Sequence, residues 1–249
     1  MQCKRRSVIG FNQAISMSWM AFTADQVIRS VPRRDIHSAL DEMLKDRLSV
    51  NSNAKRGDRQ KAISILLRIW ARPEPSMKSF MEDGLRLFSE APGGFRQCVD
   101  YGMTISAYPF VSVVAQTLGR LFRLQGYATT AEVQRRLKER YGPRWTVTRG
   151  ANRVLKSFTD WGFIVHEQSK GICKSGVQRV ISEPGLGSWL LEALLYCSES
   201  GTGLFQSLVS SPALFPFLLD FQNERPPRMS DRVEVAPHGW DDFILKLKN

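Results

Sequence analysis

The amino-acid sequence predicts a mainly α-helical protein of the α+β class. Apolar residues recur at helical spacing through most of the chain, and strand-like runs are confined to short stretches after residue 162. The 249 residues, 43% hydrophobic and 24% charged, are enough for the sizeable core of an ordinary globular protein. We expect a helical N-terminal domain over residues 1–105, a compact domain over 106–182 and a helical extension with a small β-hairpin over 183–249.

The N-terminal domain is expected to consist of helices joined by short breaks. Thr23 is suited to cap one helix, and apolar residues alternate with charged ones at helical spacing over 33–48 and 58–70. Pro73 ends the helix over 58–70 because the residue before a proline disfavours helical backbone angles. A further helix is expected over 77–88.

The compact domain begins with two helices that have clear boundary signals. The first, over 111–124, ends where Gly126 suits a left-handed C-terminal cap. The second opens at Thr129, and Glu132 three residues later completes a capping box, in which each residue satisfies a backbone N–H of the other. The sequence Tyr141-Gly-Pro then stops this helix.

A third helix follows, and Thr146 or Thr148 is expected to cap it. Its apolar residues recur at the spacing of a buried stripe: Ala151, Val154, Leu155, Phe158 and Trp161. Its opposite face carries Arg149, Asn152, Arg153 and Lys156. Gly162 ends the helix, and two strand-like runs then surround a turn near Lys170. This order of helix, capped helix, basic helix and hairpin predicts a winged helix-turn-helix, whose third helix enters the major groove of DNA.

Positive charge is concentrated on this domain. Residues 120–182 hold 13 Lys and Arg against four Asp and Glu, whereas the whole chain has 35 against 24. Such a concentration is typical of a nucleic-acid binder. Arg suits bidentate contact with guanine, Asn suits adenine, and Lys contacts phosphate. The predicted contacts to double-stranded DNA are Arg135, Arg136, Arg144, Thr148, Arg149, Asn152, Arg153, Lys156, Lys170 and Lys174.

A second basic cluster lies at the start of the helix over 58–70 and comprises Lys55, Arg56, Arg59 and Lys61. Acidic residues surround it, which favours a solvated surface of mixed charge over a binding site. A secondary phosphate contact stays open as the alternative.

The C-terminal extension is expected to contain a helix over 188–196 and a hairpin of 232–235 and 242–247 around Pro237. The segment 204–221 is rich in Leu and Phe, but it also contains Pro212 and Pro216. Two prolines four residues apart break the continuous helix that a bilayer demands, so we expect a buried, kinked segment and no membrane span.

Sequence signals for catalysis, cofactors and metals are missing. No Walker A, dinucleotide-binding or H-E-x-x-H motif occurs, and the four cysteines are too scattered for a zinc site. Asp241 and Asp242 lie near His238, yet adjacent carboxylates on a strand point to opposite faces and do not converge on one metal ion. The basic start is not followed by a small-residue cleavage site. We therefore expect a cytoplasmic protein that is no enzyme and needs no cofactor or metal.

Two stretches resemble the BrxA family, the accessory proteins of bacterial BREX phage-defence systems. One is the run 46–56 leading into a helix, and the other extends from Tyr108-Pro-Phe-Val111 to 158–164. The resemblance implies a helical N-terminal domain, a winged-helix-like half that binds DNA, and no catalytic residues. This chain departs from the family pattern in its long C-terminal extension and its more basic third helix.

The hypothesis that follows is a non-enzymatic protein that binds duplex DNA together with other subunits of a bacterial defence complex. Two alternatives stay open. An adaptor would dock a partner protein on its winged helix, and the apolar segment 204–221 favours that reading. A transcriptional repressor would form a stable homodimer, but the sequence offers no two-fold dimerisation element, so we expect modest sequence preference.

Overall fold

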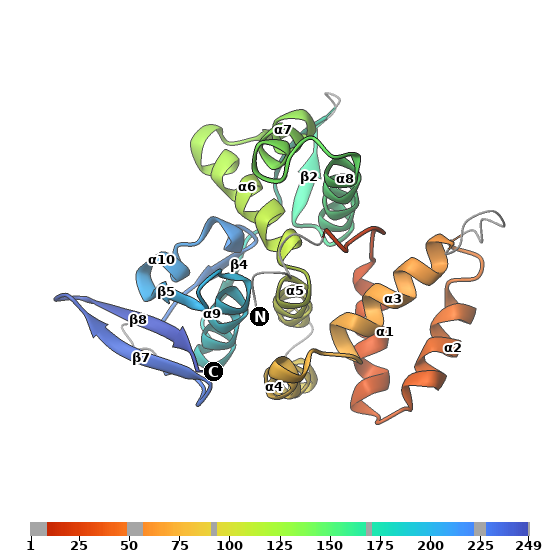
Figure 1. The fold of residues 1–249 in the computed structure, drawn as a ribbon, viewed down its shortest axis with the longest axis horizontal. Helices are drawn as coiled ribbons and strands as arrows, with labels where there is room; N and C mark the ends of the chain where they lie inside the picture. Colours follow the sequence, from red (N-terminus) through yellow and green to blue (C-terminus); the bar gives the residue numbers. More distant parts are fainter. Residues whose placement is uncertain (1–8, 49–56, 91–93, 168–170, 222–227, 249) are drawn as a thin grey trace.

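The computed structural model describes residues 9–48, 57–90, 94–167, 171–221 and 228–248 (Figure 1). Helices make up most of this part of the chain, and its strands form three small sheets. The fold is therefore mainly α with some β structure, as the sequence predicts. The buried apolar residues of all three predicted segments join in one continuous core.

The N-terminal part contains the helices α1 (Met17–Ile28), α2 (Arg33–Met43), α3 (Asp58–Trp70) and α4 (Lys78–Glu90), with the 3-10 turn η2 (Pro75–Met77) before α4. The bounds of α3 confirm the prediction. The prediction that Thr23 caps α1 is wrong: Thr23 is buried within the helix, where its hydroxyl donates to the backbone oxygen of Trp19 at 2.7 Å. The expected helix over 33–48 ends early because the chain turns at Leu44, which is fully buried.

The helix α5 (Arg96–Ala107) lies at the centre of the molecule, and every residue from Cys98 to its end is buried (Figure 1). It packs against α1, α3, α4, α6 and α9. Sequence analysis missed it because a helix covered on all sides has no polar face and gives no amphipathic signal. No single helix among the described residues is long and apolar enough to cross a membrane; segments 94–107 and 109–125 reach that length only jointly and are bent by 116°.

Residues 109–175 form helices and strands in the predicted order. These are α6 (Pro109–Gln125), β1 (Ala128–Thr129), α7 (Thr130–Tyr141), α8 (Trp145–Asp160), β2 (Ile164–His166) and β3 (Ile172–Ser175). β3 lies between β1 and β2 and is antiparallel to both. The capping box of α7 is confirmed, with Thr129 and Glu132 each accepting the other's backbone N–H at 3.1 Å. Gly126 and Gly162 take the left-handed conformation expected at helix ends.

The prediction that Thr146 or Thr148 caps α8 is wrong. Gly142, with φ of 83°, turns the chain immediately after α7, so α8 begins at Trp145 with Arg144 as its N-cap. Both threonines consequently lie inside the first turns of the helix. The predicted buried stripe is confirmed, since Ala151, Val154, Leu155, Phe158 and Trp161 are all buried.

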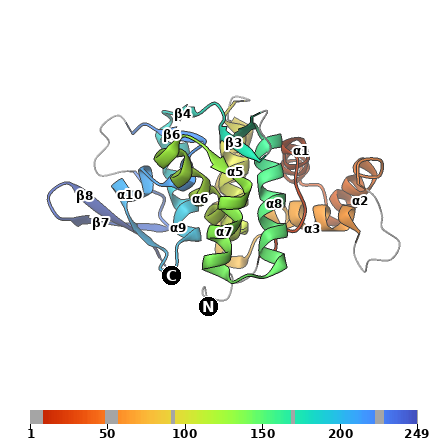
Figure 2. The ribbon, with the colours of Figure 1, turned by 90° about the horizontal axis from the view of Figure 1, so that it is seen from above.

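The C-terminal part surrounds α9 (Pro184–Cys197), which starts four residues before the predicted helix because Pro184 suits its first turn. β4 (Arg179–Ile181) pairs in parallel with β6 (Phe217–Leu219). β5 (Thr202–Leu204), β8 (Asp242–Leu247) and β7 (Val233–His238) form an antiparallel sheet, which confirms the predicted hairpin. The predicted turn at Pro237 is wrong: Pro237 pairs with Phe243 within the ladder, and the chain turns at 239–241, where Gly239 has a positive φ. The hairpin projects from the body of the molecule (Figures 1 and 2).

The apolar segment 204–221 folds into short pieces, namely α10 (Phe205–Val209), the 3-10 turn η3 (Pro212–Leu214) and β6. Its aromatic side chains at 205, 215, 217 and 221 are buried, which confirms the buried, kinked interpretation. η3 packs against α6 so closely that a Cβ on Gly119 would lie 1.9 Å from the backbone oxygen of Pro212.

A buried ion pair joins the hairpin to the helical body. Glu192 on α9 is 1% exposed, and Arg232 donates to its two carboxylate oxygens at 2.6 and 3.1 Å. Arg232 also donates to Asp83 of α4 at 2.6 Å. Burial lowers the pKa of Arg232, but its hydrogen bonds to Glu192 and Asp83 outweigh burial and raise that pKa above its usual range. The guanidinium is therefore a fixed charge that the fold requires.

Candidate nucleic-acid interface

One flank of the basic helix α8 is covered by the extended segment 9–16. The backbone N–H of Ile15 donates to Oγ of Ser157 at 2.9 Å, and the oxygen of Ile15 accepts from the indole of Trp161 at 2.8 Å. A Cβ on Gly150 would lie 2.5 Å from the side chain of Ile9, so the two segments touch along about three turns of the helix. This segment fixes α8 against the body and leaves a different face of the helix uncovered.

The uncovered face carries the residues that we name the open stripe: Trp145, Arg149, Asn152 and Lys156. Their spacing of four, three and four residues places them on one side of a helix. Trp145, Asn152 and Lys156 are exposed, and Arg149 is half-buried. The helices α7 and α8 lie side by side, and neither is covered by another element in the view from above (Figure 2). The open stripe is thus accessible to a large ligand.

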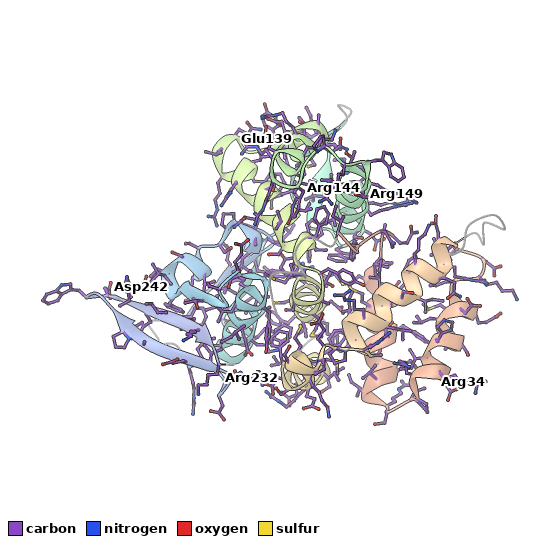
Figure 3. All side chains as sticks on the ribbon, in the orientation of Figure 1. Arg34, Glu139, Arg144, Arg149, Arg232 and Asp242 are labelled. Carbon is purple, nitrogen blue, oxygen red and sulfur yellow. The ribbon has the colours of Figure 1, made fainter. Side chains whose placement is uncertain are left out.

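The first turn of α8 combines an aromatic side chain with cations. The guanidinium carbon of Arg149 lies 5.0 Å from the centre of the Trp145 ring, a cation–π contact. Arg144 is exposed, and its Nε donates to the backbone oxygen of Tyr141 at 3.2 Å. Arg149 projects from α8 into the space above the end of α3 (Figure 3). Sequence analysis named both arginines but missed Trp145, although an apolar aromatic directly before the polar face of a basic helix was the available signal.

Arg153 lies at the edge of the open stripe that is nearest to the N-terminal helices. Its side chain is 25% exposed, and its guanidinium lies 3.9 Å from the carboxylate of Asp58 at the start of α3. Lys61 donates to the same carboxylate at 2.8 Å. This hydrogen bond, together with the charges of Lys61, Arg153 and Arg149, lowers the pKa of Asp58. The structure therefore turns Arg153 toward the N-terminal helices and offsets its charge.

The predicted contacts on α7 are Arg135 and Arg136. Arg136 is half-buried, and Arg135 is exposed and forms an ion pair with Glu139 at 2.8 Å. Gln134 donates its amide to Oδ1 of Asn152 at 2.7 Å, which links α7 to the stripe and orients the Asn152 side chain. Side chains of α7 and α8 thus make one polar surface.

The remaining predicted contacts belong to segment 164–175, to the first turn of α8 and to the second basic cluster. Lys174 on β3 is ion-paired with Glu167, and Thr148 is half-buried on α8. Arg59 is 17% exposed and pairs with Asp41 of α2 at 2.9 Å, so it joins two helices and is not presented to solvent. Lys55, Arg56 and Lys170 lie outside the described residues.

A cavity of about 370 Å³ lies beside the first turn of α8. Its walls come from three separate segments: residues 9–12, Lys61 of α3, and Arg144, Trp145 and Arg149 of α8. Every charged side chain in this lining is positive. The cavity therefore extends the basic surface from α8 to the N-terminal helices.

The titratable groups in the core are buried and do not contribute to this surface. Asp100 is buried, which raises its pKa well above the ordinary value, and it accepts the indole N–H of Trp70 at 3.1 Å. Burial likewise raises the pKa of the Cys98 thiol. Within the described ranges, no three His, Cys, Asp or Glu side chains gather closely enough to hold a metal ion. These buried groups serve packing.

The site that these residues form is a basic, partly aromatic surface on an uncovered helix. It can offer donors to phosphate oxygens and base edges, and an indole face to a ring system. No protein-family model, no curated protein and no solved structure matches this chain.

Proposed function

We propose that this protein is a non-enzymatic DNA-binding protein that holds duplex DNA with a winged helix formed by residues 109–175. The order of elements supports the proposal: α6, α7 and α8 correspond to the three helices, and β1, β3 and β2 to the small sheet and its wing. In this reading α8 is the recognition helix, and the strands β2 and β3 belong to the wing.

The single observation that carries the proposal is the open stripe of α8. A helix side that is both basic and uncovered matches the major groove, which admits an α-helix and displays base-edge donors and acceptors beside rows of phosphates. Arg149 and Asn152 would face base edges, and Lys156 would contact phosphate. Arg144, directly before Trp145, and Arg136 on α7 would add phosphate contacts, which supply affinity without sequence information.

The biological setting of this binding follows from the resemblance to the BrxA family. We place the protein with other subunits of a bacterial phage-defence complex, as an accessory factor that brings the complex to DNA. The adaptor alternative loses much of its support, because the aromatic side chains of segment 204–221 are buried in the protein's own core, although Leu218 is 49% exposed.

The test is a fluorescence-anisotropy titration of a labelled duplex at ~50 and ~200 mM salt. A protein that neutralises about four phosphates should lose on the order of 100-fold in affinity over this range. The variant Arg149→Glu/Lys156→Glu should abolish binding. The matched control is Arg33→Glu/Arg34→Glu, which changes the net charge equally at the start of α2, far from the stripe (Figure 3).

Retained binding by the control and loss in the stripe variant would support the proposal. Wild-type protein that binds no duplex at ~50 mM salt would overturn it. Equal losses in the two variants would also overturn it, since the effect would then reflect net charge alone. Circular dichroism of each variant establishes that the proteins compared are folded.

A further inference from the structure

Trp145 is unusual among the aromatic side chains of this chain because it is 69% exposed at the centre of a basic surface. Exposing an indole leaves a large apolar area in water, and this residue contributes nothing to the core. Trp240 is also exposed, but it lies at the tip of the β7–β8 hairpin beside Asp241 and Asp242. Only Trp145 combines an exposed ring with neighbouring cations.

The ring of Trp145 is held from one side and open on the other. Arg149 lies over the ring at 5.0 Å, one turn further along α8, and this contact limits the rotamers that the indole adopts. With one face occupied by the guanidinium and most of the side chain still exposed, the opposite face is available to a planar ring. The indole is thereby pre-positioned for stacking.

The cavity beside the indole has the chemistry of a nucleotide site. Its volume of about 370 Å³ falls within the range of small-molecule sites. Ile9 provides an apolar wall, and Arg144 and Lys61 line the same cavity as Trp145. Cations suit a phosphate, an apolar wall suits the face of a base, and the positive lining excludes a cationic ligand.

We propose that Trp145 and this cavity take up an unpaired nucleotide, with its base stacked on the indole and its phosphate held by Arg144. This inference rests on the proposed function and adds a preference for DNA that carries a bulged or extruded base. Both faces of a base in an intact duplex are covered by its neighbours, so a ring that stacks must meet a base outside the helical stack. Cations without an aromatic platform would give no such preference.

The test compares a labelled blunt duplex with the same duplex carrying an unpaired adenine bulge. We expect the wild type to bind the bulged duplex about tenfold more tightly, because stacking on an aromatic side chain contributes about this much per base. Trp145→Ala should remove the preference by weakening binding of the bulged duplex about tenfold more than binding of the blunt duplex, and Trp145→Phe should retain part of it. Trp240→Ala is the control for loss of an exposed indole.

A second readout is the intrinsic fluorescence of Trp145. In a Trp240→Phe background, the bulged duplex should quench emission more than the blunt duplex does, and the additional Trp145→Phe change should remove that difference. Equal wild-type affinity for both duplexes would overturn the inference and leave the proposed function intact. Equal weakening of both duplexes by Trp145→Ala would also overturn it, because the indole would then be an ordinary duplex contact.

Two further outcomes separate this inference from the proposed function. Binding of bulged or single-stranded DNA without binding of blunt duplex would support the nucleotide site and refute duplex recognition. Binding of neither DNA, with poly-glutamate quenching Trp145 instead, would overturn both proposals and identify the cavity as a site for an acidic peptide.

Discussion

Two cations that are three residues apart on α8 should differ in how much each contributes to the salt dependence of DNA binding. Lys156 is exposed on the open stripe, whereas Arg153 is 25% exposed and lies 3.9 Å from Asp58. If Lys156 contacts one phosphate, Lys156→Ala should lower the log–log salt slope by about 0.9. A fourfold rise in salt, from ~50 to ~200 mM, then weakens the variant about 3.5-fold less than it weakens the wild type. Arg153→Ala should leave the slope unchanged.

The assay is fluorescence anisotropy at four salt concentrations with one labelled duplex for both variants. Thermal unfolding serves as the control, and Arg153→Ala should cost less than ~1 kcal/mol, as is usual for a partly exposed ion pair. The reasoning is refuted if Arg153→Ala lowers the slope as much as Lys156→Ala does, since Arg153 would then leave Asp58 to bind phosphate. An unchanged slope for Lys156→Ala would show that the stripe is not the face that meets the backbone.

Three further predictions concern the framework that holds this surface. Arg232→Met should lower the free energy of unfolding by about 3–5 kcal/mol in urea denaturation, because Glu192 is left as an unpaired buried charge, and adding Glu192→Leu should recover most of that loss. Gly119→Ala should cost at least about 1–3 kcal/mol in the same assay, since its Cβ would lie 1.9 Å from a backbone oxygen of η3; no loss would mean that η3 is not seated there. The pKa of Asp58 is lowered by Lys61 and its other cations, so the folded state binds fewer protons and the carboxylate stabilises above the ordinary pKa of 3.8. Asp58→Asn should therefore be less stable than wild type near neutral pH and approach it in acid below that value; a gap independent of pH would refute the ion pairing.

Local signals in the sequence predicted the compact part of the fold well. The capping box at Thr129 and Glu132 and the glycines at 126 and 162 act within a few residues of the chain. Such features depend on backbone geometry alone, so they are readable without knowledge of the tertiary fold. The third helix was located by its apolar period, and only its starting residue was misplaced, because the glycine turn before it needs no side-chain cap.

Contacts between distant segments were beyond sequence reasoning. The period of α8 separates its buried side from its polar side, but it does not reveal that segment 9–16 covers one flank or that Asp58 meets Arg153. For the same reason Arg59 was named as a possible contact, although it pairs with Asp41. The central helix α5 escaped notice because uniform burial removes periodicity. Partners far apart in sequence decide which cations a surface presents.

The N-terminal helices and the basic helix therefore act as one surface. Segment 9–16 connects α1 to α8 through hydrogen bonds of the Ile15 backbone to the side chains of Ser157 and Trp161, and Asp58 at the start of α3 draws Arg153 away from the stripe. The same approach brings Lys61 to the cavity beside Trp145, which neither part could form alone. A ligand on α8 consequently meets side chains from both parts of the chain. The N-terminal part therefore affects what the open stripe can bind. Asp58 pairs with Arg153, while Lys61 and residues 9–12 line the cavity beside the indole of Trp145.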